Sequence, residues 1–137
     1  MVYITKIEHF NAAHKLWNEN WDVEKNKKVF GKCANENYHG HNYELHVTVK
    51  GELNKDTGFV INAKDLGSII KEHIIELVDH NNLNVDVEFM KGKFTSAENL
   101  AIAIWDILKD LIIQNGCSLH CIKIIETRSI YVEYFGE

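Results

Sequence analysis

The stretch Gly31-Lys-Cys-Ala-Asn-Glu-Asn-Tyr-His-Gly-His-Asn-Tyr43 places a thiol, Cys33, six residues before two histidines that one glycine separates. Apolar and polar residues then alternate to the end of 39–51, a pattern that predicts a half-buried strand. Side chains two apart on a strand point to the same face, so His39 and His41 project together. Two imidazoles on one strand begin a metal site. A catalytic zinc site needs a third protein ligand and keeps one position open.

The third ligand is predicted to be His14. Residues 2–16 are rich in β-formers and predict a long first strand. If this strand pairs antiparallel with 39–51, its end lies opposite His39 and His41. The small residues before His14 leave room there, and an all-imidazole set favours zinc. The alternative is three unrelated histidines in a strand pair.

The rest of the chain predicts two helices and two more strands. Apolar residues occupy most even-numbered positions of the first strand, but Lys6 and Glu8 interrupt this pattern. The interruption predicts a bulge or a change of partner strand. Residues 17–38 have no clean period and predict a long loop. Asn62 is a plausible N-cap for a helix that ends near Asp79-His80, and Thr95-Ser96-Ala97-Glu98 reads as a capping box for a second helix.

Strands are predicted over 118–126 and 129–135, joined by a tight hairpin at 127–129. The order ββααββ indicates an α+β fold with a four-stranded antiparallel sheet and both helices on one face. The simplest organisation is one domain over residues 1–137. An open sheet exposes two edges, so we expect a homo-oligomer formed by strand pairing.

Composition argues against several classes of function and location. The chain has 137 residues and a net charge of −5, which argues against a general nucleic-acid partner. No apolar run approaches the ~20 residues of a membrane span, and the first residues do not resemble a signal peptide. The three cysteines are an odd number, which favours a reducing cytoplasm without disulfides.

Further groups could carry chemistry, and each has a simpler alternative. Cys33 could close a structural zinc site, act as a base or nucleophile beside an open one, or be an ordinary loop cysteine. The pair Asp79-His80 could be an acid–base relay, or a helix end with a histidine at the negative end of the dipole. Glu126 could accept two hydrogen bonds from a heterocycle, or be a solvated strand end.

Two loop features also stay open. The loop lysines Lys25, Lys27, Lys28 and Lys32 could attract phosphates, although a charge run in a loop is usually solvated. Trp17 and Trp21 could pack over a pocket or serve the structure alone.

Together these residues resemble the 6-pyruvoyl-tetrahydropterin synthase family, which includes 6-carboxy-tetrahydropterin synthases. The matching motifs span nearly the whole chain. They are Phe10-x-Ala-Ala-His14-x-Leu16, Phe30-Gly31-Lys32-Cys33, His39-Gly40-His41-Asn42-Tyr43, Asp79-His80-x-Asn82-Leu83, Thr95-Ser96-x-Glu98-Asn99 and Glu126-Thr127. The resemblance implies the tunnelling fold (T-fold) of that family, which oligomerises into a barrel as a trimer or dimer of trimers with active sites between subunits.

The resemblance also implies site roles. Zn²⁺ would be held by His14, His39 and His41, Cys33 would be the general base, and Asp79 with His80 would form its relay. Glu126 and Thr127 would bind the pterin together with the backbone around Thr95 and Ser96. The implied substrate is 7,8-dihydroneopterin triphosphate, which loses triphosphate and gives 6-pyruvoyl-tetrahydropterin through internal redox.

Spacing within the loop bears on the product. Relatives that make 6-carboxy-tetrahydropterin for queuosine and other 7-deazaguanines usually have Cys-x3-His-Gly-His, whereas this chain has Cys-x5-His-Gly-His. Another group places a glutamate three residues before the first histidine and releases 6-hydroxymethyl-dihydropterin for folate synthesis. Glu36 occupies that position here beside Cys33, so mixed-base chemistry is an open hypothesis. A zinc-stabilised binding module is the non-enzyme alternative.

Overall fold

The computed structural model describes residues 1–137, and five strands form one sheet in the order β3-β1-β2-β4-β5. The strands are β1 Val2–His14, β2 His39–Gly51, β3 Asn81–Asn82, β4 Ser118–Thr127 and β5 Ile130–Tyr134. The four long strands pair antiparallel, as predicted. The expected four-stranded antiparallel sheet is nevertheless wrong, because β3 pairs in parallel with β1. Two flanking hydrogen bonds secure this edge, from His80 N to Asn11 O (2.6 Å) and from Leu83 N to Ala13 O (2.8 Å).

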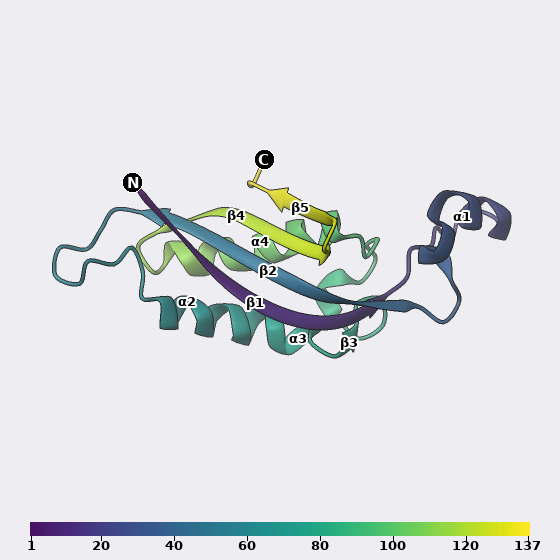
Figure 1. Ribbon diagram of the computed structural model, residues 1–137, viewed down its shortest axis with the longest axis horizontal. Helices are drawn as coiled ribbons and strands as arrows, with labels where there is room; N and C mark the ends of the chain where they lie inside the picture. The colour runs from purple at the N-terminus through teal and green to yellow at the C-terminus, as the bar shows by residue number, and fades with distance from the viewer.

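Two helical segments cover one face of the sheet (Figure 1). The first runs through α2 Ala63–Ile70, a π-helical turn η2 Lys71–Ile75 and α3 Glu76–Val78. The second is α4 Ala97–Ile113, and a 3₁₀ turn, η3 Glu88–Met90, lies between the two. The core is the space between helices and sheet, where apolar side chains of β2 and β4 meet those of α2 and α4. The predicted packing of both helices on one face is confirmed. No helix combines the length and apolarity needed to cross a membrane.

The predicted loop 17–38 contains helical structure that its sequence pattern did not indicate. Helix α1 Val23–Phe30 and the 3₁₀ turn η1 Gly31–Ala34 project from one end of the molecule (Figure 1). The Asp22 carboxylate caps α1 by accepting from Lys25 N at 2.7 Å. Only the polar residue Asn26 is buried on this helix. An apolar stripe, the usual signature of a helix in sequence, is therefore absent.

The predicted bulge in β1 is also wrong, because β1 pairs with β2 in one unbroken register from Val2↔Gly51 to His14↔His39. Lys6 and Glu8 keep their inward parity and form an ion pair at 3.3 Å. A Cβ on Gly67 of α2 would lie 3.0 Å from Lys6 Cε. The absence of a side chain at Gly67 therefore leaves room for this ion pair between the helix and the sheet.

The helix caps agree with the sequence in one case and differ by one residue in the other. Asn62 caps α2 by accepting from Lys64 N at 2.9 Å, as predicted. Ser96, not Thr95, caps α4 and accepts from Asn99 N at 3.3 Å. The capping box predicted to begin at Thr95 is therefore wrong by one position. Thr95 does not cap the helix and is buried, with 1% of its surface exposed.

Candidate metal centre and active site

Three histidines converge where β1 ends and β2 begins. His14 and His39 are directly opposed in the β1–β2 register, and His41 follows on the same face of β2. The imidazole centroids lie 4.5 Å apart for His14–His39, 5.1 Å for His14–His41 and 4.9 Å for His39–His41. One ring nitrogen of each lies within 4.8 Å of the other two. The predicted gathering of these side chains is confirmed.

The free ring nitrogens fit a metal ion. His14 Nε2, His39 Nδ1 and His41 Nε2 are buried and have no hydrogen-bond partner. Buried polar atoms without partners are uncommon and call for an explanation such as an ion. Burial lowers the pKa of the His39 and His41 imidazoles below their ordinary value, with the nearby His14 adding to the effect. Neutral imidazole is the form that binds metals.

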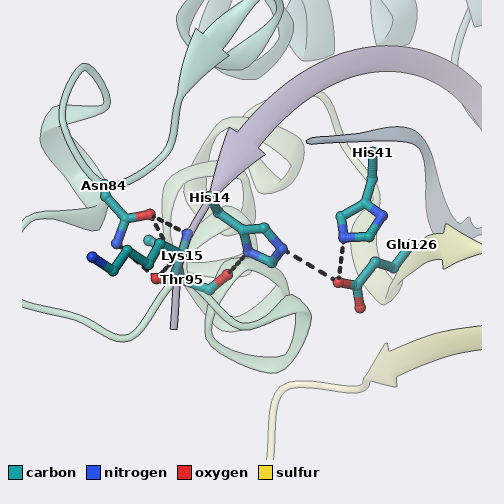
Figure 2. Close-up of polar contacts among 6 residues, drawn as sticks. All are labelled: His14, Lys15, His41, Asn84, Thr95 and Glu126. Carbon is teal, nitrogen blue, oxygen red and sulfur yellow. Dashed lines mark hydrogen bonds and ion pairs between the residues drawn. The ribbon is translucent and has the colours of Figure 1, made fainter. Parts of the chain in front are cut away.

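A support network fixes the orientation of His14 (Figure 2). Its Nδ1 lies 2.6 Å from the carbonyl oxygen of Thr95. The Thr95 hydroxyl in turn lies 3.0 Å from Asn84 Oδ1 and 3.2 Å from Lys15 O. Asn84 also accepts from Lys15 N at 2.8 Å and donates to Lys15 O at 3.0 Å. Outer partners of this kind set the tautomer and direction of a ligand histidine.

Glu126 enters the same site from β4. Its Oε1 lies 3.1 Å from His41 Nε2 and 3.5 Å from His14 Nε2 (Figure 2). The imidazoles of His14 and His41 hold the pKa of this carboxyl below its ordinary value, which favours the ionised form. Glu126 is therefore an ionised carboxylate beside the three histidines, and not the solvated strand end that its position alone would suggest.

Tyr43 is a further member of the site, for which its sequence motif predicted no role. It follows His41 on the inner face of β2, is 1% exposed, and stacks on Phe10 at 4.7 Å between ring centroids. Its hydroxyl is buried without a partner. Burial first, and then the neighbouring charges of Glu126 and Cys33, raise the pKa of its phenol well above the ordinary value. Tyr43 lies two residues after His41 and so shares its face of the strand, and this spacing was the signal that could have placed it in the site.

Cys33 lies on η1 and is half-buried, and like the buried Cys117 and Cys121 it forms no disulfide. Its carbonyl accepts from Leu16 N at 2.8 Å, two residues beyond His14. The preceding segment is held by Asn26, which accepts from Asn18 N at 2.7 Å and donates to Asn18 O and Asp22 O, each at 3.0 Å. A fully buried asparagine thus fixes the loop that carries the thiol.

Asp79 and His80 form a pair, but on the surface. Asp79 Oδ1 lies 3.0 Å from His80 Nδ1 and accepts from Asn11 N at 2.9 Å. The His80 side chain is 81% exposed and contacts none of the three converging histidines. The Asn11 amide, and secondarily His80, lower the pKa of Asp79. Within one chain, the pair ends the helix and secures β3 beside β1.

Comparison with known proteins identifies the family. The sequence model of 6-pyruvoyl tetrahydropterin synthase matches residues 3–137. The chain belongs to this synthase family. The 6-pyruvoyl tetrahydrobiopterin synthase of Dictyostelium discoideum is 41% identical over 140 residues, which cover 99% of this chain and 97% of that protein. The human enzyme of that name is 41% identical over 128 residues, covering 93% and 87%. The solved Caenorhabditis elegans 6-pyruvoyl tetrahydropterin synthase has a TM-score of 0.91 at 35% identity, covering 99% and 96%.

The other residues expected from the synthase family differ in exposure and in what their side chains contact. Thr95 is buried and supports His14, and Ser96 caps α4, so their side chains are engaged in the fold. Thr127 accepts from Ser129 N at 3.3 Å in the β4–β5 turn. Glu36 is exposed in a separate hollow and is not among the converging groups. Their roles toward a ligand stay predictions.

Proposed function

We propose that this chain is a zinc-dependent 6-pyruvoyl-tetrahydropterin synthase, a carbon–oxygen lyase that converts 7,8-dihydroneopterin triphosphate to 6-pyruvoyl-tetrahydropterin and triphosphate. The observation that carries the proposal is the convergence of three buried, unpartnered imidazole nitrogens within 4.8 Å, in a chain that matches this family over residues 3–137. Three imidazoles form the donor set of an open catalytic zinc site. Further proposals are that residues 1–137 form one T-fold domain and that the enzyme acts in the cytoplasm.

Zinc held by His14, His39 and His41 would polarise the side-chain oxygens of the substrate and acidify the adjacent C–H bond. The Cys33 thiolate takes a proton from that carbon. The ionised Glu126 accepts hydrogen bonds from the amidine-like edge of the pterin ring, a pairing that suits a carboxylate with two oxygens. The buried side chains of Tyr43 and His14 exclude water from one side of the reacting chain.

Asp79 and His80 are proposed as the second proton-transfer group. Their exposure on a single chain suits a role in an active site completed by a neighbouring copy. The open edges of β3 and β5 leave backbone groups free for strand pairing between copies. We therefore propose a trimer or a dimer of trimers whose sheets close into a barrel. Light scattering on the purified chain tests this assembly, and a monomer at working concentration would contradict it.

The activity is tested by incubating the zinc-loaded chain with 7,8-dihydroneopterin triphosphate and identifying the products by mass spectrometry. Cys33→Ala is expected to keep its zinc and lose turnover. If it instead loses zinc and melts at lower temperature, Cys33 is a fourth ligand of a structural site and the binding-module alternative holds.

The product is tested with Glu36→Ala beside wild type. Glu36 is exposed, whereas Cys33 is half-buried and close enough to Tyr43, beside His41, to affect the pKa of its phenol, which favours Cys33 as the base and the pyruvoyl product. A wild-type product mixture containing 6-hydroxymethyl-dihydropterin that Glu36→Ala abolishes would support mixed-base chemistry. A predominant 6-carboxy-tetrahydropterin would assign the chain to the 7-deazaguanine branch.

A further inference from the structure

A hollow begins one residue beyond two of the three histidines. His14 and His39 are paired across β1 and β2, and the next residue outward on each side is Lys15 and Tyr38. The Lys15 ammonium lies 5.7 Å from the centre of the Tyr38 ring and 4.9 Å from that of Trp17. All three residues line a hollow of about 620 Å³ that Lys27 of α1 also borders. A cation is therefore held on aromatic faces beside the metal centre.

This cation has no carboxylate partner. Neither Lys15 nor Lys27 takes part in any ion pair of the chain. Glu36 borders the same hollow, but its exposed side chain lies beyond ion-pair distance of both lysines. The backbone N–H and carbonyl of Lys15 are engaged by Asn84 in the network that supports His14. Lys15 therefore has a fixed position relative to His14, while its ammonium is available to an anion.

The groups occur in a fixed order along β2. Glu126 directly follows Ile125, the β4 partner of Glu44, whereas Tyr38 and the lysine hollow lie just before His39. The histidines lie between these two ends. The Glu126 carboxylate approaches His14 from the side of Nε2, at 3.5 Å. Figure 2 shows Glu126 and Lys15 on opposite sides of the His14 ring. A ligand that follows this order has a hydrogen-bonding ring at one end and an anion at the other.

We propose that Lys15, with Lys27 beside it, binds the phosphate chain of the pterin triphosphate whose ring is held at Glu126. This assignment rests on the proposed function. The ammonium neutralises charge on the phosphate oxygens as a point charge, which is the usual manner of lysine toward phosphate. Trp17 and Tyr38 hold the ammonium through cation–π contacts, which reduces the side-chain freedom lost on binding.

The test compares two ligands on the zinc-loaded chain carrying Cys33→Ala, which prevents turnover. Calorimetry measures the binding of 7,8-dihydroneopterin and of its triphosphate to this parent, and to the parent with Lys15→Gln, Lys15→Arg or Lys64→Gln added. Lys64 is a matched exposed lysine in the first turn of α2, which lies away from α1 (Figure 1). Zinc content and melting temperature are recorded for every variant.

Lys15→Gln is expected to weaken binding of the triphosphate roughly tenfold, or about 1.4 kcal/mol, and to leave dihydroneopterin binding unchanged. Lys15→Arg restores most of the loss and Lys64→Gln changes neither ligand. Added salt reduces the advantage of the triphosphate in the parent, because it screens the charge contact.

Three results overturn the assignment. Equal weakening of both ligands by Lys15→Gln means that the residue acts through His14 or the ring, and no weakening of either means that the phosphates lie elsewhere. In both cases the proposed function stands, because the parent binds the pterin. A parent that binds neither ligand overturns the proposed function, and the phosphate assignment falls with it.

Discussion

His14 Nδ1 lies 2.6 Å from the carbonyl oxygen of Thr95, and this contact decides what the opposite side of the ring can do. A backbone carbonyl only accepts, so Nδ1 carries the proton and Nε2 keeps a free lone pair. That lone pair is buried without a hydrogen-bond partner, and Glu126 Oε1 lies 3.5 Å from the nitrogen that carries it. His14 can therefore bind a metal only through Nε2.

Replacing His14 by alanine is expected to abolish stoichiometric zinc. It removes one of three ligands, so the affinity should fall by more than the roughly 10–100-fold that losing an outer partner costs. Metal content after dialysis measures this. The matched control is His9→Ala, which alters an exposed histidine on the same strand. Zinc retained equally by both variants would contradict the proposed metal site.

Replacing Asn84 by alanine is expected to weaken zinc binding up to roughly tenfold. The change removes the hydrogen bonds that hold Lys15 and Thr95 next to His14. Asn84 is exposed, so water replaces part of the loss and the free energy of unfolding should fall by only about 1 kcal/mol. Chelator competition and urea titration measure the two effects. Asn115→Ala, an exposed asparagine that donates to Leu111 O, should leave zinc binding unchanged, and equal zinc affinity in both variants would refute the positioning role.

Much of the fold was predictable because its strands and helices carry clear periodicity. The prediction of 39–51 as a strand matches β2 residue for residue. Strand β3 was missed because two polar residues, Asn81 and Asn82, pair with β1 through backbone groups alone. Helix α1 was missed because an Asp22 cap and the buried amide of Asn26 hold it, and neither produces an apolar period.

The position of the three histidines could be predicted from strand parity and register. His39 and His41 share a face by spacing, and antiparallel pairing of β1 with β2 brings His14 opposite them. The approach of Glu126 and the support from Asn84 depend on β4 and on the segment after β3, which no local pattern places. Whether Asp79 and His80 meet the histidines of another copy depends on assembly, which lies beyond a single chain.

Replacing Asn26 by alanine is expected to loosen the segment that carries Cys33. The change removes the four side-chain hydrogen bonds of a fully buried amide and leaves the Asn18 N–H without its partner, at a cost of roughly 1–3 kcal/mol. Amide exchange should speed up across 17–34 and turnover should fall, while zinc content stays constant. Asn20→Ala, an exposed neighbour, is the control. Unchanged exchange in this segment would show that Asn26 does not hold it.

Replacing Asp79 by asparagine is expected to cost stability at neutral pH and little in acid. The Asn11 amide, and then His80, lower the pKa of Asp79 below its ordinary 3.8, so the folded chain favours the carboxylate. This stabilisation is therefore fully present above about pH 3.8 and is lost as the pH falls through the lower pKa of the folded state, because the unfolded chain takes up the proton first. Asparagine keeps an acceptor for Asn11 N but not the charge. Urea unfolding of both proteins at pH 7 and at pH 3 measures the difference, with Asp56→Asn as an exposed control. A difference that persists undiminished in acid would mean that Asp79 stabilises the fold through packing and not through its charge.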